Sequence, residues 1–66
     1  MSDFAEASLA YIQFMNICLG YYKNLTIRTI YQKIKENKKF LIWILNKKAL
    51  TVYEANDFIF KLKINE

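Results

Sequence analysis

The chain has 66 residues and a formal net charge of +4, and 55% of its residues are hydrophobic. A chain of this length forms one domain, so we treat residues 1–66 as a single unit. The usual parts of an enzyme or a metal centre are missing, because there is no histidine, one cysteine and one glycine. We therefore expect no catalytic residues, no metal site and no cofactor.

The cysteine content and the N-terminal residues indicate an intracellular, reducing compartment. Cys18 is the single cysteine, whereas a secreted chain of this size normally carries several disulfides. Asp3 and Glu6 stand where a secretory signal would carry basic residues. The longest apolar run, residues 40–45, is far shorter than the roughly 18 to 20 residues of a membrane span. We expect a cytoplasmic protein in a reducing environment, without a transmembrane segment.

The first predicted element is a helix over about residues 3–22, with Ser2 or Asp3 as its N-cap. Cys18 reads as a small core residue of this helix. Two apolar stripes recur at intervals of three and four residues. The main stripe is Ala5, Ser8, Ile12, Met15, Leu19 and Tyr22, and the second is Phe14, Ile17 and Tyr21.

Two further helices are expected in the middle of the chain. Thr26 is a good N-cap for a helix over about 26–36. Residues 37–48 fit a buried strand or a helix that is apolar on all sides, and we favour a helix capped by Asn37. The expected inner face of the second helix is Ile27, Ile30, Tyr31 and Ile34.

Residues 49–64 allow two interpretations. Phe58, Phe60, Leu62 and Ile64 alternate with other residues, which predicts a β-hairpin with Asn56 and Asp57 in its turn. Alternatively, Thr51 and Glu54 form a capping box for a helix, whose apolar stripe is Val52, Ala55, Ile59 and Leu62. The hairpin makes the protein α+β, with three helices before the hairpin, and the alternative makes it an all-α bundle of three or four helices.

With the hairpin, the order of elements resembles a winged helix-turn-helix domain. In that family a leucine, a short basic stretch and a small residue lead from the third helix into the first wing strand. Residues 45–50 (Leu-Asn-Lys-Lys-Ala-Leu) followed by residues 58–62 (Phe-Ile-Phe-Lys-Leu) have this pattern. The resemblance implies a third helix in the major groove of duplex DNA, a wing against the phosphates, and dimers that read paired half-sites. This chain departs from the family in its third helix, which is apolar where the family presents polar side chains to the bases.

Basic residues gather in the middle third of the chain, where residues 23–48 contain eight of them and one acid, Glu36. A localised basic segment is the electrostatic signature of a polyanion partner. We therefore expect a small nucleic-acid-binding protein, a DNA-binding regulator of a virus, phage or plasmid, that contacts mainly phosphates. The candidate contact residues are Arg28, Lys33, Lys35, Lys38, Lys39, Lys47, Lys48, Lys61 and Lys63.

The surplus of apolar residues supports a second hypothesis, a non-enzymatic protein-interaction module such as an inhibitor or an assembly subunit. So small a domain cannot bury all of its apolar residues, and such a surplus usually becomes an interface. We expect a homodimer or a tight protein partner on these grounds. The candidate interface residues are Phe40, Leu41, Trp43 and Ile44.

Overall fold

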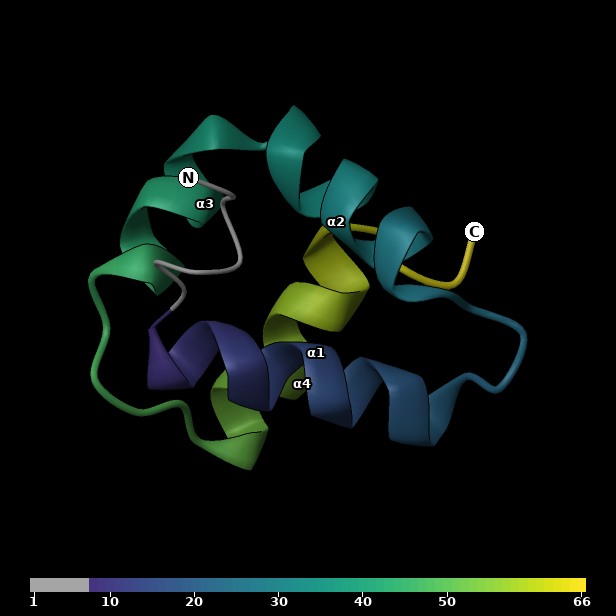
Figure 1. Ribbon diagram of the computed structural model, residues 1–66, viewed down its shortest axis with the longest axis horizontal. Coiled ribbons are helices and arrows are strands. Elements are labelled where there is room, and N and C mark those ends of the chain that lie inside the picture. The colour runs from purple at the N-terminus through teal and green to yellow at the C-terminus, as the bar shows by residue number, and fades with distance from the viewer. Residues whose placement is uncertain (1–7) are drawn as a thin grey trace.

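The computed structural model describes residues 8–66, which form four helices (Figure 1). They are α1 (Leu9–Tyr21), α2 (Ile27–Glu36), α3 (Lys38–Leu45) and α4 (Val52–Lys61). Helix α1 packs against each of the other three helices, and α2 also packs against α3. The described part of the chain contains no strand. The fold of residues 8–66 is therefore all helical.

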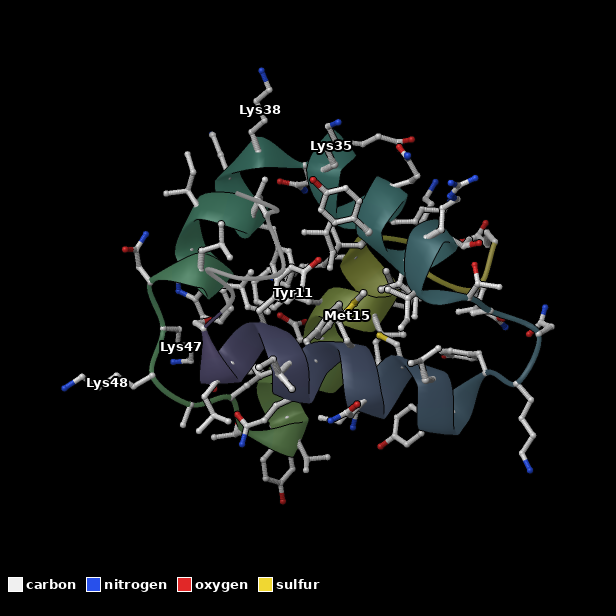
Figure 2. All side chains as sticks on the ribbon, in the orientation of Figure 1. Tyr11, Met15, Lys35, Lys38, Lys47 and Lys48 are labelled. Carbon is white, nitrogen blue, oxygen red and sulfur yellow. The ribbon has the colours of Figure 1, made fainter. Side chains whose placement is uncertain are left out.

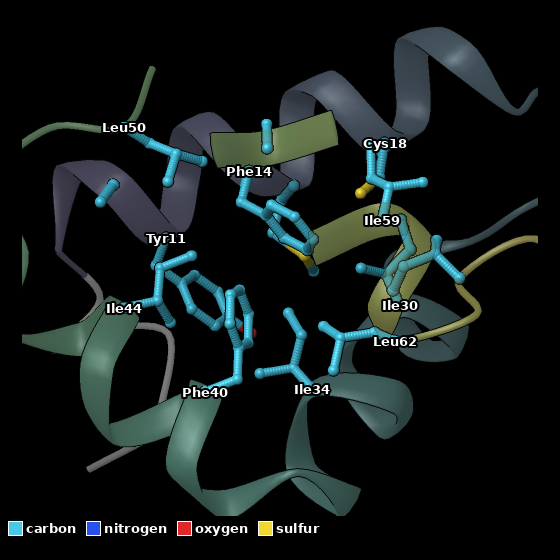
Figure 3. Close-up of a cluster of buried hydrophobic side chains, with 14 residues drawn as sticks. Tyr11, Phe14, Cys18, Ile30, Ile34, Phe40, Ile44, Leu50, Ile59 and Leu62 are labelled. Carbon is cyan, nitrogen blue, oxygen red and sulfur yellow. The ribbon is translucent and has the colours of Figure 1, made fainter. Parts of the chain in front are cut away.

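One hydrophobic core joins the four helices (Figure 3). Phe40 of α3 lies at its centre, with its ring centroid 5.1 Å from that of Phe14 in α1 and 4.4 Å from that of Phe58 in α4. Ile30 and Ile34 enter from α2 and are fully buried. The complete set of buried residues is Ala10, Tyr11, Phe14, Met15, Cys18, Ile30, Ile34, Phe40, Ile44, Leu50, Ala55, Ile59, Leu62 and Ile64.

Helix α1 begins later than predicted, and a different face is buried. Ser8 is its N-cap and accepts a hydrogen bond from the Tyr11 amide (3.1 Å), while its hydroxyl donates to the Ile44 carbonyl at the end of α3. The predicted cap at Ser2 or Asp3 lies outside the described residues. The predicted main stripe was wrong for Ile12, which is 47% exposed. Most of α1 is apolar, so residue spacing alone did not identify the face that meets three other helices.

Helices α2 and α3 confirm the predicted caps. The Thr26 hydroxyl accepts from the Thr29 amide (3.2 Å), and the Asn37 side chain accepts from the Phe40 amide (3.1 Å). Asn37 also ends α2, so one residue separates the two helices. Helix α3 ends at Leu45, three residues before the predicted end.

The predicted β-hairpin was wrong, and with it the α+β winged-helix fold class. Residues 52–61 form α4, and both hydrogen bonds of the alternative capping box are present. The Glu54 amide donates to the Thr51 hydroxyl (3.1 Å), and the Thr51 amide donates to the Glu54 carboxylate (3.0 Å). Asn56 and Asp57 lie inside the helix and do not form a turn between strands. Ala55 and Ile59, which are four residues apart, face the core because the local period is helical.

Candidate functional site

Five basic residues lie on α2 and the first turn of α3. We call this set the α2–α3 basic surface: Arg28, Lys33, Lys35, Lys38 and Lys39. All are exposed except Lys33, which is partly buried. Because Ile30 and Ile34 turn one side of α2 to the core, its charged residues are left on the outward side. Lys38 and Lys39 are close by because a single residue joins the helices, and Figure 2 shows Lys35 and Lys38 projecting from the same end of the molecule.

The charges of this surface are largely uncompensated. Within residues 8–66 no ion pair involves any of the five side chains, and Glu36 is the one acid between residues 23 and 48. The Lys35 ammonium lies 5.9 Å from the centroid of the Tyr31 ring. The surface therefore offers positive charge to an external anion, because no carboxylate of residues 8–66 forms an ion pair with these side chains.

Two of the other predicted phosphate ligands have acidic partners. The Lys47 ammonium lies 3.1 Å from the Glu54 carboxylate and 5.0 Å from the Trp43 ring centroid. The Lys61 ammonium lies 2.9 Å from the Asp57 carboxylate, one turn earlier in α4. A backbone hydrogen bond from Thr51 and the Lys47 ammonium hold the pKa of Glu54 below its usual value, so this partner stays ionised at neutral pH.

The remaining two lysines lie outside α2 and α3. Lys48 belongs to the connection between α3 and α4 and, in Figure 2, projects away from Lys35 and Lys38. Lys63 follows α4 and lines a cleft between α1 and α4. The structure thus places five of the predicted cations on α2 and the first turn of α3, and the other four on other segments.

The predicted interface segment contributes mainly to the hydrophobic core of the four helices. Phe40 and Ile44 are buried, and Leu41 is partly buried and packs against the core. Trp43 is 36% exposed, with its ring centroid 4.9 Å from that of Phe58. The side chains of this segment that remain at the surface are therefore Trp43 and its neighbour Ile42, which is 64% exposed.

A cleft that the sequence did not indicate opens between the end of α1 and the second half of α4. Its volume is about 370 Å³, and its floor includes the buried Ile59. The hairpin interpretation hid this cleft, because it placed Asn56 in a turn and Phe60 on a strand. The capping box was the sequence signal for a helix here. In a helix, Asn56 and Phe60 lie on the same side because they are four residues apart. The full lining is Tyr21, Tyr22, Asn56, Ile59, Phe60, Lys63, Asn65 and Glu66.

Within residues 8–66, the side chains with potential for covalent or metal chemistry form no site. Cys18 is fully buried, and burial raises the pKa of its thiol to about 12, so it is protonated at neutral pH. Among residues 8–66 no three cysteine or acidic side chains come together in a way that could hold a metal ion. Across the same part of the chain, no helix has the length and apolar character needed to cross a bilayer.

Comparisons with protein-family models, with curated protein sequences and with solved structures find no match to this chain. A function can therefore be assigned only from the residues and their arrangement.

Proposed function

We propose that the protein binds duplex DNA through its phosphates, using the α2–α3 basic surface. The observation that carries the proposal is the gathering of Arg28, Lys33, Lys35, Lys38 and Lys39 on two adjacent helices, with no ion pair to the rest of residues 8–66. Lysine and arginine that neutralise phosphates release condensed counterions, and this release provides the affinity.

The side chains beside this surface favour backbone contacts over base recognition. Sequence is read by polar groups such as arginine, asparagine and glutamine in the major groove. Beyond Lys38 and Lys39, α3 turns Ile42 and Trp43 toward solvent, and neither can bond to a base edge in this way. The one arginine of the chain, Arg28, lies in α2. We therefore propose a DNA-binding protein with modest sequence preference.

A salt titration with two matched lysine variants tests this function. With four or five phosphates neutralised, the logarithm of the affinity should fall with the logarithm of salt concentration with a slope of about −4. Lys38→Gln should weaken binding and make the slope shallower by about 1. Lys48→Gln makes the same charge change in a lysine that points elsewhere, so it should leave the slope unchanged.

The measurement is fluorescence anisotropy of a labelled duplex of mixed sequence at several salt concentrations. Circular dichroism of both variants controls for folding, and both substituted side chains are exposed. Equal losses in Lys38→Gln and Lys48→Gln would mean that net charge alone attracts the DNA. No binding at 50 mM salt would remove the proposal.

A further inference from the structure

The cleft between α1 and α4 is built on firmly held elements. One wall is the last turn of α1 with Tyr21, and the other is the part of α4 from Asn56 to Phe60. The chain after α4 is turned back by hydrogen bonds from the Ile64 amide to the Ile59 carbonyl (3.1 Å) and from the Glu66 amide to the Lys63 carbonyl (3.1 Å). Ile64 is fully buried, and this anchors the segment that carries the lining residues Lys63, Asn65 and Glu66.

Aromatic rings and free amide groups line this cleft. Tyr21 is 53% exposed and Phe60 is 83% exposed, so both rings are accessible to a ligand. The side chains of Asn56 and Asn65 make no hydrogen bond within residues 8–66, and each offers a donor and an acceptor. Lys63 and Glu66 oppose each other in charge, so the lining does not favour a ligand with several charges of one sign.

We infer that this cleft binds an unstacked nucleobase, either of a single strand or of a free nucleotide. A base has a flat face that stacks on aromatic rings and an edge that pairs with amide and carboxylate groups. The cleft volume of about 370 Å³ lies within the range of small-molecule sites. An aliphatic ligand would leave the two asparagine side chains without partners, and a polyphosphate would meet Glu66.

The position of the cleft also suits a nucleic-acid strand. The connection from Tyr21 leads directly to α2, and Arg28 lies in the first turn of that helix. Figure 1 shows the end of α1, the start of α2 and the C-terminus on the same side of the molecule. A strand with one base in the cleft could continue along α2, which is roughly 15 Å long. In this form the inference rests on the proposed function, because α2 carries the phosphate ligands.

Two exposed aromatic residues of α4 provide a matched pair of variants. Both side chains are similarly exposed, at 83% for Phe60 and 87% for Tyr53, but only Phe60 belongs to the cleft lining. Phe60→Ala should lower the affinity for a single-stranded 12-mer roughly tenfold or more, because one stacking contact is lost. It should change the affinity for the matching duplex less than twofold. Tyr53→Ala should leave both affinities unchanged.

The controls separate this inference from the proposed function. Lys38→Gln tests the phosphate surface on the duplex, while Phe60→Ala tests the cleft on the single strand. Equal effects of Phe60→Ala and Tyr53→Ala on the single strand, or no effect of Phe60→Ala, would overturn the cleft assignment even if duplex binding is retained.

A mononucleotide titration covers the case in which no strand binds. Adenosine and cytidine monophosphates at millimolar concentration should shift the side-chain amide NMR signals of Asn56 and Asn65, and Phe60→Ala should abolish the shifts. Mononucleotide affinity that matches that of the strand would identify a free nucleotide as the ligand. If these signals do not shift and the single strand binds no better than the duplex, the inference is wrong.

Discussion

Lys63 has a backbone conformation that glycine normally supplies. Its φ of 53° is left-handed, and it follows the C-cap Leu62 of α4. The Ile64 amide donates to the Ile59 carbonyl, and the Lys63 amide donates to the Phe60 carbonyl at 3.2 Å. These two hydrogen bonds form a Schellman motif, which most often contains glycine at this position because a Cβ is strained there.

Lys63→Gly should therefore stabilise the fold. Removing the side chain relieves a backbone strain of about 1 kcal/mol, while both hydrogen bonds of the motif are kept. Urea denaturation followed by circular dichroism measures the change in the free energy of unfolding. Lys63→Ala is the control, because alanine removes the same charge but keeps the Cβ. A gain of equal size in Lys63→Ala would show that charge, and not backbone strain, sets the effect.

At the scale of the element, α2 and α3 could be predicted from the sequence, whereas α4 could not be distinguished from a β-hairpin. Thr26 and Asn37 have side chains that cap helices, and each accepts a hydrogen bond three residues later as expected. In residues 49–64 the apolar residues fit both the period of a helix and the alternation of a strand. The hairpin interpretation placed Phe60, Leu62 and Ile64 on one buried face. In the structure Phe60 is 83% exposed, whereas Leu62 and Ile64 are buried and follow the end of α4. Packing of Ala55 and Ile59 on the core decides in favour of the helix, and that packing depends on distant residues.

The capping box is the local interaction that favours α4, and Thr51→Ala tests how much it contributes to stability. The variant removes the oxygen that accepts from the Glu54 amide, so the free energy of unfolding should fall by about 1 kcal/mol. Thr51→Ser keeps the oxygen, so its free energy of unfolding should fall by about a few tenths of a kcal/mol at most. Thermal and urea denaturation of both variants supply the comparison. A loss in Thr51→Ser as large as that in Thr51→Ala would assign the effect to the methyl group and not to the cap.

Over the whole molecule, the sequence predicts nearby charges better than distant ones. Residues of the α2–α3 basic surface stay together because they lie within two helices that one residue connects. The ion pairs of Lys47 and Lys61 depend on α4. This helix brings Glu54 beside Lys47 and places Asp57 one turn before Lys61. With residues 49–64 interpreted as a hairpin, neither pairing could be foreseen. The cleft was missed for the same reason, since it needs α4 to pass the end of α1.

The apolar segment 40–45 shows how the whole molecule determines the role of a residue. As a surface patch, it would join two proteins. In the structure, Phe40 connects Phe14 of α1 with Phe58 of α4, and it is 3% exposed. A loss of this ring removes contacts from three helices at once, so it should affect the unfolding of the single subunit.

Phe40→Ala should destabilise the subunit by about 3 to 5 kcal/mol, the usual cost of removing a buried phenylalanine. The total stability of a domain this small is of similar size, so the variant should be largely unfolded at 25 °C. Phe40→Leu should keep the fold at a smaller cost, and Ile42→Ala, at a side chain that is 64% exposed, should be close to neutral. Circular dichroism and the fluorescence of Trp43, measured over a range of protein concentrations, report unfolding and association separately. If Phe40→Ala kept its helical signal and lost only a concentration-dependent association, this ring would act between subunits and not within one.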